Sequence, residues 1–217
     1  MTFLSLLTTL VLFTTGCEPA TKPHNTMMAN EIIPDGKKMD TATFGTGCYW
    51  CTEAVFQELK GVAKTISGFS GGTVANPSYE EVCTGTTGHA ECLQIIYDPT
   101  VITYDELLEV FWEVHDPTTL NMQGNDVGTQ YRSAIFYHND EQKQKAEHYK
   151  AELNKSGAYD KPIVTEITAY SKFYPAGDYH QNYYNTHGSQ PYCTFVIRPK
   201  VEKFEKVFKD KLKKNNK

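Results

Sequence analysis

The stretch TATFGTGCYWCTEAVFQELK, residues 41–60, changes from the pattern of a strand to that of a helix. Residues 41–45 predict a short strand, and residues 52–60 predict a helix with its apolar side chains on one face. Between them, Gly45 and Gly47 deliver Cys48 to the first turn of the helix. Unpaired N–H groups and the positive end of the helix dipole meet there and stabilise a thiolate. Cys48 is therefore a candidate nucleophile.

A buried structural cysteine is the alternative interpretation of Cys48. The two residues that follow, Tyr49 and Trp50, argue against it. Two adjacent large aromatic side chains are an unusual choice in a tight turn unless they form the wall of a pocket.

The alternation of strand and helix continues along the chain. Thr103 and Glu106 have capping-box spacing, Asn139 is a candidate N-cap and Gly157 stands where a C-cap glycine belongs. The order of elements predicts one α/β domain with split βαβ connections of the ferredoxin-like kind. Further strands are predicted at residues 62–69, 89–97, 131–137, 163–170 and 194–197, and helices at 103–115 and 140–155.

The first 40 residues differ in composition from the rest of the 217-residue chain. Residues 1–16 carry no charge, and residues 3–13 form an apolar run of signal-peptide length that is too short to span a membrane. Cys17 follows small residues, as in a bacterial lipoprotein signal, and residues 18–40 resemble a flexible linker. We expect a signal or lipoprotein segment at 1–17, a linker at 18–40 and an extracytoplasmic domain at 41–217, lipid-anchored at Cys17. A buried N-terminal helix is the alternative.

The charge distribution excludes one class of partner. The net charge is −5, but residues 198–217 carry nine Lys or Arg against three Asp or Glu, so the rest of the chain has a net charge of −11. An acidic body with a short basic tail is a poor nucleic-acid binder. The tail places Val201, Phe204, Phe208 and Leu212 on one face of a predicted helix, so its lysines are interpreted as a solvated face.

Five ordered blocks between residues 41 and 200 resemble the signature motifs of the type A peptide methionine sulfoxide reductases. The blocks are GCYWCTE (47–53), GFSGG (68–72), NPSYEEVC (76–83), TGHAE (87–91) and DVGTQYRS (126–133). The resemblance implies a thiol reductase for the S epimer of methionine sulfoxide, free or in proteins, on a two-layer α/β fold with a mixed sheet. It implies no bound cofactor and no metal.

The resemblance also implies roles for single residues. Cys48 matches the nucleophile, which is left as a sulfenic acid when methionine departs. Glu91 matches the general acid, whose carboxyl an apolar pocket would keep protonated by raising its pKa. Tyr79 and Tyr131 match the hydroxyls that hold the sulfoxide oxygen, and Asp126 matches a carboxylate of the substrate pocket. Tyr49 and Trp50 would receive the methyl group, with Tyr49 standing where the family usually has Phe.

Regeneration requires a second thiol that converts the sulfenic acid into a disulfide, which thioredoxin or another dithiol then reduces. Cys193 lies in the C-terminal region where the family commonly keeps such a resolving cysteine, and it is the favoured candidate. Cys51 is the second candidate, because it forms a C-x-x-C pair with Cys48 at a position where the family often has Gly. The substrates are oxidised proteins or free methionine sulfoxide, and the protein is expected to be a monomer.

Two other functions remain as alternatives at this point. Cys48 and Cys51 at a helix start are also compatible with a thioredoxin-like disulfide oxidoreductase. Cys48, Cys51, Cys83 and Cys92 could instead hold zinc, although the second pair is more widely spaced than zinc ligands usually are. The interpretation of Cys83 and Cys92 as packing residues is the simpler one.

Overall fold

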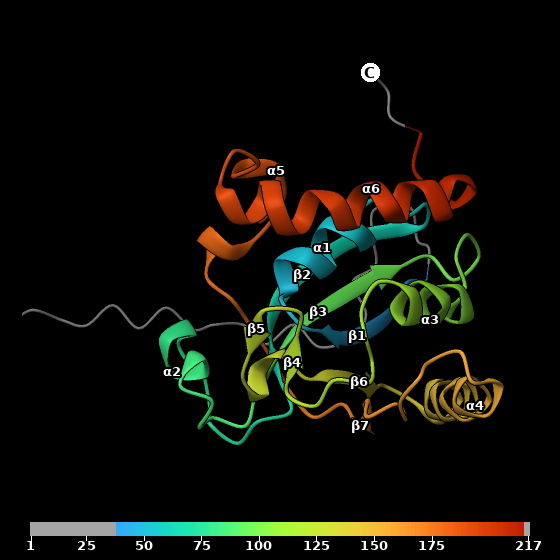
Figure 1. The fold of residues 1–217 in the computed structure, drawn as a ribbon, viewed down its shortest axis with the longest axis horizontal. Coiled ribbons are helices and arrows are strands. Elements are labelled where there is room, and N and C mark those ends of the chain that lie inside the picture. The colour runs from blue at the N-terminus through green and yellow to red at the C-terminus, as the bar shows by residue number, and fades with distance from the viewer. Residues whose placement is uncertain (1–37, 215–217) are drawn as a thin grey trace, which may run out of the picture.

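The computed structural model describes residues 38–214, and helices cover a mixed sheet in this part of the chain (Figure 1). The predicted signal segment and nearly all of the predicted linker lie outside the described residues. Within residues 38–214, no helix has both the length and the apolar composition needed to cross a bilayer. The elements are β1 (Asp40–Thr46), α1 (Tyr49–Phe56), β2 (Val62–Ser70), α2 (Tyr79–Cys83), β3 (Ala90–Tyr97), α3 (Tyr104–Glu113), β4 (Met122–Gln123), β5 (Asp126–Val127), β6 (Ser133–Tyr137), α4 (Asp140–Ser156), β7 (Glu166–Ala169), β8 (Phe173–Pro175), α5 (Tyr183–Thr186) and α6 (Arg198–Val207).

The sheet has the order β7-β6-β1-β3-β2-β8. Its four central strands, β6, β1, β3 and β2, are antiparallel to one another. β1-α1-β2 and β3-α3-β6 are two βαβ units, and each has a strand of the other between its own two strands. This arrangement confirms the predicted ferredoxin-like core. β7 adds a parallel strand to one edge and β8 an antiparallel strand to the other, so the sheet is mixed, as expected.

The sheet curls strongly because its two edges are joined by a very short segment. β7 and β8 lie on opposite edges, yet only residues 170–172 connect them. Five strand spacings in a flat sheet would take about 24 Å, whereas this connection reaches only about 10–14 Å. The curl brings the end of β2 over β6, where a side chain added to Gly71 would meet the ring of Phe136 at 2.6 Å.

The main core lies between the sheet and helices α1 and α3. Phe44 of β1 is fully buried, with its ring centroid 5.0 Å from that of Phe111 and 5.8 Å from that of Phe56. α6 lies across α1 on the side away from the sheet (Figure 1). The opposite face of the sheet carries a smaller cluster that includes Cys92 and Phe136.

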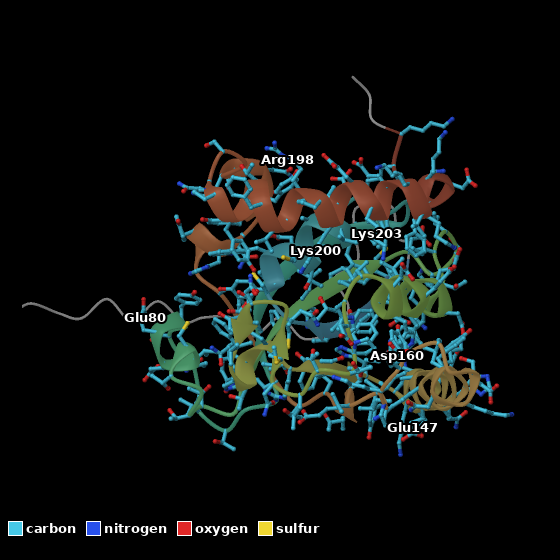
Figure 2. The ribbon with its side chains drawn as sticks, viewed as in Figure 1. Glu80, Glu147, Asp160, Arg198, Lys200 and Lys203 are labelled. Atoms are coloured by element: carbon cyan, nitrogen blue, oxygen red, sulfur yellow. The ribbon has the colours of Figure 1, made fainter. Side chains whose placement is uncertain are left out.

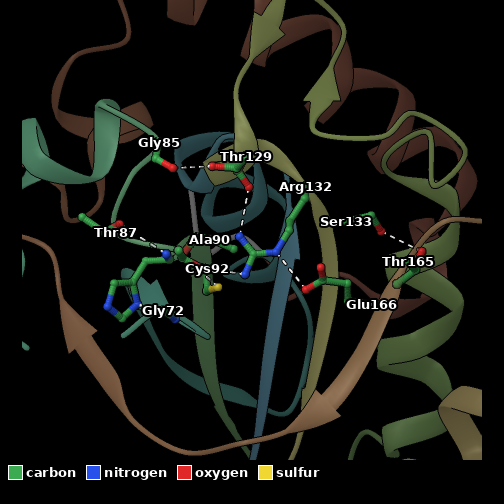
Figure 3. A network of polar contacts seen from close by, with 12 residues as sticks. Gly72, Gly85, Thr87, Ala90, Cys92, Thr129, Arg132, Ser133, Thr165 and Glu166 are labelled. Atoms are coloured by element: carbon green, nitrogen blue, oxygen red, sulfur yellow. Dashed lines mark hydrogen bonds and ion pairs between the residues drawn. The ribbon is translucent and has the colours of Figure 1, made fainter. Parts of the chain in front are cut away.

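An arginine on that opposite face joins three segments of the chain (Figure 3). Arg132 donates to the carbonyl oxygens of Thr129 and Gly88 at 3.0 Å each, and to the Glu166 carboxylate at 2.8 Å. Thr129 precedes Tyr131, and Gly88 precedes Glu91. The guanidinium therefore fixes the backbone beside two of the predicted site residues, with five rigid donors suited to such bridging.

The predicted helix caps are confirmed. Thr103 and Glu106 form a capping box at the start of α3. Asn139 accepts a hydrogen bond from the third residue of α4, and Gly157 ends that helix with a φ of 69°. Several boundaries differ by a few residues: α1 begins at Tyr49 rather than residue 52, and the strand predicted at 163–170 is limited to Glu166–Ala169.

The strand predicted at residues 194–197 is wrong. Cys193–Ile197 is a π-helical segment that leads directly into α6. Its β-branched composition favours a strand, but Cys193 and Ile197 are buried four residues apart while Phe195 between them is 78% exposed. Burial at that spacing belongs to a helix, and packing against the core overrides the local preference.

The predicted amphipathic tail helix is confirmed, although it ends at Val207. Val201, Phe204 and Phe208 are buried. Beyond the helix, the chain runs beside the turn that follows α1: Lys60 donates its amide to the carbonyl of Lys211, and Lys213 donates its amide to the carbonyl of Glu58, both at 2.8 Å. The tail therefore holds the turn that leads out of the helix carrying Cys51.

Replacing Phe44 by alanine is expected to lower the free energy of unfolding by about 3–5 kcal/mol, because it empties the centre of the main core. Urea unfolding followed by circular dichroism measures this loss. Phe195→Ala is the control, and an exposed side chain should change stability by no more than about 0.5 kcal/mol. Equal losses for the two variants would contradict this location of the core.

Candidate active site

Seven residues predicted from the sequence line one cavity of about 180 Å³. They come from α1 and its N-cap, α2, β3, β5 and the turn before β6. An eighth lining residue, Tyr192, was not predicted. The lining residues are Cys48, Tyr49, Trp50, Tyr79, Glu91, Asp126, Tyr131 and Tyr192.

Cys48 is the N-cap residue of α1, and its side chain is free of any capping hydrogen bond. The preceding Gly47 has a φ of 93°, and a Cβ there would lie 2.6 Å from the Cβ of Gln123. Only glycine fits this turn without strain, since both the backbone angle and the close approach exclude a side chain. The tight turn places Cys48 at the N-terminus of the helix, as the sequence predicts.

Cys48 and Cys51 form a pair of interacting sulfurs in the first turn of α1. Burial raises the pKa of Cys48, and its thiol donates to the sulfur of Cys51. That hydrogen bond, opposed by burial and assisted by the charge of Lys200, lowers the pKa of Cys51 to about 7. The pair therefore gives up its first proton closer to neutral pH than two ordinary thiols would. For Cys48 itself, burial favours the neutral thiol and so opposes the stabilisation of a thiolate that the helix N-terminus provides.

Glu91 lines the cavity from the central strand β3 and is 2% exposed. Its Oε2 accepts the backbone N–H of Tyr49 at 3.1 Å. Burial raises the pKa of the carboxyl to about 8, despite the opposing effect of that hydrogen bond. Glu91 is therefore largely protonated at neutral pH and able to act as an acid.

Tyr79 and Tyr131 contribute the two predicted hydroxyls. Tyr79 is the first residue of α2, which begins with a capping box between Ser78 and Glu81. Tyr131 ends a short 3-10 helix that leads into β6. Burial raises the pKa of both phenols, so both keep their protons and remain hydrogen-bond donors.

The aromatic wall of the cavity is supported from behind by residues 178–183. The ring of Trp50 stacks on Tyr183, with 3.7 Å between centroids and an interplanar angle of 8°. His180 lies between Trp50 and Tyr79, with its ring centroid 5.6 Å from that of Trp50 and 4.5 Å from that of Tyr79. The hydroxyl of Tyr49 is buried without a hydrogen-bond partner among the described residues.

Tyr192 closes the cavity and orients Asp126. Its hydroxyl donates to Oδ2 of Asp126 at 2.7 Å and lies 4.0 Å from the sulfur of Cys51. The sequence placed Tyr192 next to Cys193 but also placed both before a strand. The helical segment that begins at Cys193 turns the tyrosine toward the site instead.

The other cysteines lie apart from the cavity lining. Cys193 is fully buried in the same core cluster as Cys48 and Cys51, and burial raises its pKa. Cys83 is exposed at the end of α2, and Cys92 is buried on the opposite face of the sheet. Within residues 38–214, no group of three or more His, Cys, Asp or Glu side chains is arranged to hold a metal. The four-cysteine zinc alternative therefore finds no support in the placement of these residues.

Comparison with known proteins gives consistent matches over the described domain. A family model described as peptide methionine sulfoxide reductase matches residues 40–212. A protein of Saccharolobus solfataricus called peptide methionine sulfoxide reductase MsrA is 56% identical over 175 residues, which cover 81% of this chain and 98% of that protein.

Solved structures extend the match to the fold. Methionine sulfoxide reductase A of Corynebacterium diphtheriae is 41% identical with a TM-score of 0.65, covering 72% of this chain and 78% of its own. Mxr1 from Saccharomyces cerevisiae in reduced form is 35% identical with a TM-score of 0.67, covering 72% and 90%. Mxr1 is also solved in complex with Trx2, at 25% identity and a TM-score of 0.50, covering 73% and 91%. The chain belongs to the peptide methionine sulfoxide reductase family, and its relatives are of the MsrA type.

Proposed function

We propose that this protein reduces the S epimer of methionine sulfoxide to methionine, in peptides or as the free amino acid. The observation that carries the proposal is the meeting of a nucleophilic cysteine and a protonated carboxyl in one small cavity. Cys48 and Glu91 both line it, and burial keeps the proton on Glu91 at neutral pH. Family membership supports the same activity.

In the first step, the sulfur of Cys48 attacks the sulfur of the sulfoxide. The oxygen is transferred: the S–O bond of the substrate breaks, an S–O bond to Cys48 forms, methionine leaves and Cys48 becomes a sulfenic acid. Glu91 delivers a proton to the oxygen as its charge develops, and Cys48 loses its own proton to its neighbour Cys51. The sulfur of methionine is reduced by two electrons and that of Cys48 is oxidised by two.

The remaining lining residues bind and orient the substrate. The hydroxyls of Tyr79 and Tyr131 are donors for the sulfoxide oxygen, and such donors stabilise the charge that forms there. The rings of Tyr49 and Trp50 provide an apolar surface for the S-methyl group. Asp126, held by Tyr192, is a substrate-pocket carboxylate.

Regeneration uses a second thiol and then an external dithiol. A thiol attacks the sulfenic acid of Cys48, a disulfide forms and water leaves. The sequence favours Cys193 for this role, whereas the hydrogen bond between the two sulfurs supports Cys51. We propose thioredoxin or an equivalent dithiol as the final reductant, supported by the complex of the relative Mxr1 with Trx2.

We further propose that the protein works outside the cytoplasm, in the periplasm or cell envelope. The proposal rests on residues 1–17 of the sequence, with Cys17 as the site of a lipid anchor. Mass spectrometry of the mature N-terminus tests it. An unprocessed Met1 would contradict it.

A thioredoxin-like disulfide oxidoreductase is not favoured. That function needs only Cys48 and Cys51 and gives no role to Glu91, Tyr79 or Tyr131, which line the same cavity. The family match covers these residues as well.

Cys48→Ser is expected to abolish reduction of the S epimer, because a hydroxyl is a far weaker nucleophile than a thiolate. Methionine formation with dithiothreitol as reductant is measured by chromatography, with the R epimer as the negative substrate. Cys92→Ala is the matched control, since that cysteine lies on the opposite face of the sheet, and it should keep activity. Full turnover by Cys48→Ser would refute the proposed nucleophile.

Glu91→Gln should lower kcat by about 10²–10⁴-fold, the range typical of a general acid. In the native protein, kcat should fall as the pH rises above about 8, because Glu91 then loses its proton. The variant should lose this alkaline limb. If the kcat of Glu91→Gln is close to that of the native protein, Glu91 is not the general acid.

Glu91→Gln, which lowers activity, is expected to raise stability at neutral pH. The pKa of Glu91 is raised from about 4.3 in the unfolded chain to about 8 in the folded protein. The unfolded chain therefore releases its proton first, and the native protein loses stability as the pH rises from about 4 toward 8. Glu91→Gln should be more stable than the native protein at pH 7, with the difference vanishing near pH 4. Unfolding curves at several pH values measure this, and a constant difference would contradict it.

Cys51→Ser should slow the dithiothreitol-driven reaction, because it removes the proton acceptor of Cys48, but should not abolish it, because the small dithiol can reduce the sulfenic acid directly. Turnover with thioredoxin should be lost. Cys193→Ser should keep both activities. Parallel assays with the two reductants distinguish the candidates. The reverse result, with thioredoxin turnover lost only in Cys193→Ser, would assign the resolving role to Cys193.

A further inference from the structure

Cys51 has a cationic neighbour, Lys200, that lies outside the five ordered sequence blocks. Nζ of Lys200 lies 3.6 Å from the sulfur of Cys51, within hydrogen-bonding distance for sulfur. Lys200 stands in the first turn of α6, and α6 packs across α1. The contact therefore joins two helices separated by about 150 residues of chain.

The charged and titratable groups that act on Cys51 come from several elements. Cys48 faces it from the same helix, and Tyr192 from the segment before α6. Asp126 of β5, Glu91 of β3 and Cys193 act on it through space. The two carboxyl groups and the two thiols favour a neutral Cys51 whenever they carry negative charge. Lys200 supplies the opposing positive charge.

Lys200 also reaches solvent on its other side. It lines a second cavity of about 650 Å³ together with Trp112, His115 and Phe204. Lys203, one turn further along α6, lines the same cavity but pairs with Glu113 at 2.8 Å. Figure 2 shows both lysines on this helix. Lys200 and Lys203 thus share a helix, a charge and a cavity, and differ in their contact with Cys51.

We propose that Lys200 is a positioning residue for the resolving step, which holds the sulfur of Cys51 as a thiolate directed at Cys48. The inference rests on the proposed function. A thiolate is the form that attacks sulfur, so a fixed ammonium at this distance both increases its population and restrains its direction. The lowered pKa of Cys51 agrees with the geometry.

The chemistry balances with the groups already in the site. When Cys48 attacks the sulfoxide, its proton passes to Cys51, whose thiolate Lys200 stabilises beforehand. In the resolving step Cys51 gives up this proton and Lys200 holds the resulting thiolate. Its sulfur bonds to the sulfur of Cys48, the S–O bond breaks, and the hydroxide takes the proton and leaves as water. Cys51 is thereby oxidised and the sulfenic sulfur reduced. Reduction of the disulfide by a dithiol restores the proton of Cys48, the thiolate of Cys51 and the proton of Glu91.

The test is a single turnover in the Cys193→Ser background, which leaves Cys51 as the candidate resolving thiol in the described chain. One equivalent of the S sulfoxide is mixed with the reduced protein without reductant at a series of pH values. Methionine is quantified by chromatography, and the loss of free thiols by acid quench, alkylation and mass spectrometry. The two readouts separate sulfoxide reduction from disulfide formation.

Lys200→Gln should form stoichiometric methionine but close the disulfide about tenfold more slowly near pH 7, with its pH midpoint moved up by about one unit. Lys203→Gln is the matched control and should behave as the parent. Lys200→Arg, which keeps the charge, should restore most of the rate. Thermal melts establish that all three variants are folded.

Either of two kinds of result, absence of the disulfide or absence of a charge effect at Lys200, would overturn the inference while leaving the proposed function intact. One is methionine formation without any Cys48–Cys51 disulfide. The other is a Lys200→Gln profile identical to that of Lys203→Gln, or equal slowing by Gln and Arg at an unchanged pH midpoint, which would indicate packing rather than charge. Failure of the parent to form methionine would refute the proposed function itself.

Discussion

The hydrogen bond from the backbone amide of Tyr49 to Glu91 joins the first helix to the central strand of the sheet, and the site is arranged around it. The amide belongs to the residue after Cys48, and the carboxyl stands on β3, between β1 and β2. One bond thus sets the separation of the proposed nucleophile from the proposed acid. It also gives the buried carboxyl a partner, without which its burial would cost more.

The site concentrates groups that oppose folding. A carboxyl, two thiols and several phenols are buried together, and burial raises the pKa of most of them. The packing that offsets this cost lies elsewhere: in the aromatic core around Phe44, in the stacked rings behind Trp50, and in the Arg132 bridges on the far face of the sheet. The protein therefore keeps its reactive groups rigid by means of residues that never touch substrate.

Most of the fold and nearly the whole cavity lining could be predicted from the sequence. The features that were predicted depend on local signals, and those that were missed depend on tertiary packing. Helix caps such as Thr103 with Glu106 are local, so they can be recognised without the fold. The order of strands and helices left few topologies open. The strand at 194–197 failed because its burial is set by α1 and the core rather than by its own β-branched residues. Tyr192 was missed with it, since its orientation depends on that same segment, and Lys200 is brought to Cys51 only by the packing of α6 on α1.

The C-terminal segment after α6 has a practical consequence for work with this protein. It pairs with the turn after α1 through Lys211 and Lys213, while the beginning of α1 is fixed by Glu91. The helix that carries both interacting sulfurs is thus held at its start, and the turn after it is held by a segment far away in the chain. Residues up to Lys213 therefore belong to any minimal expression fragment, because a shorter one would leave the turn after the active-site helix without these two backbone partners.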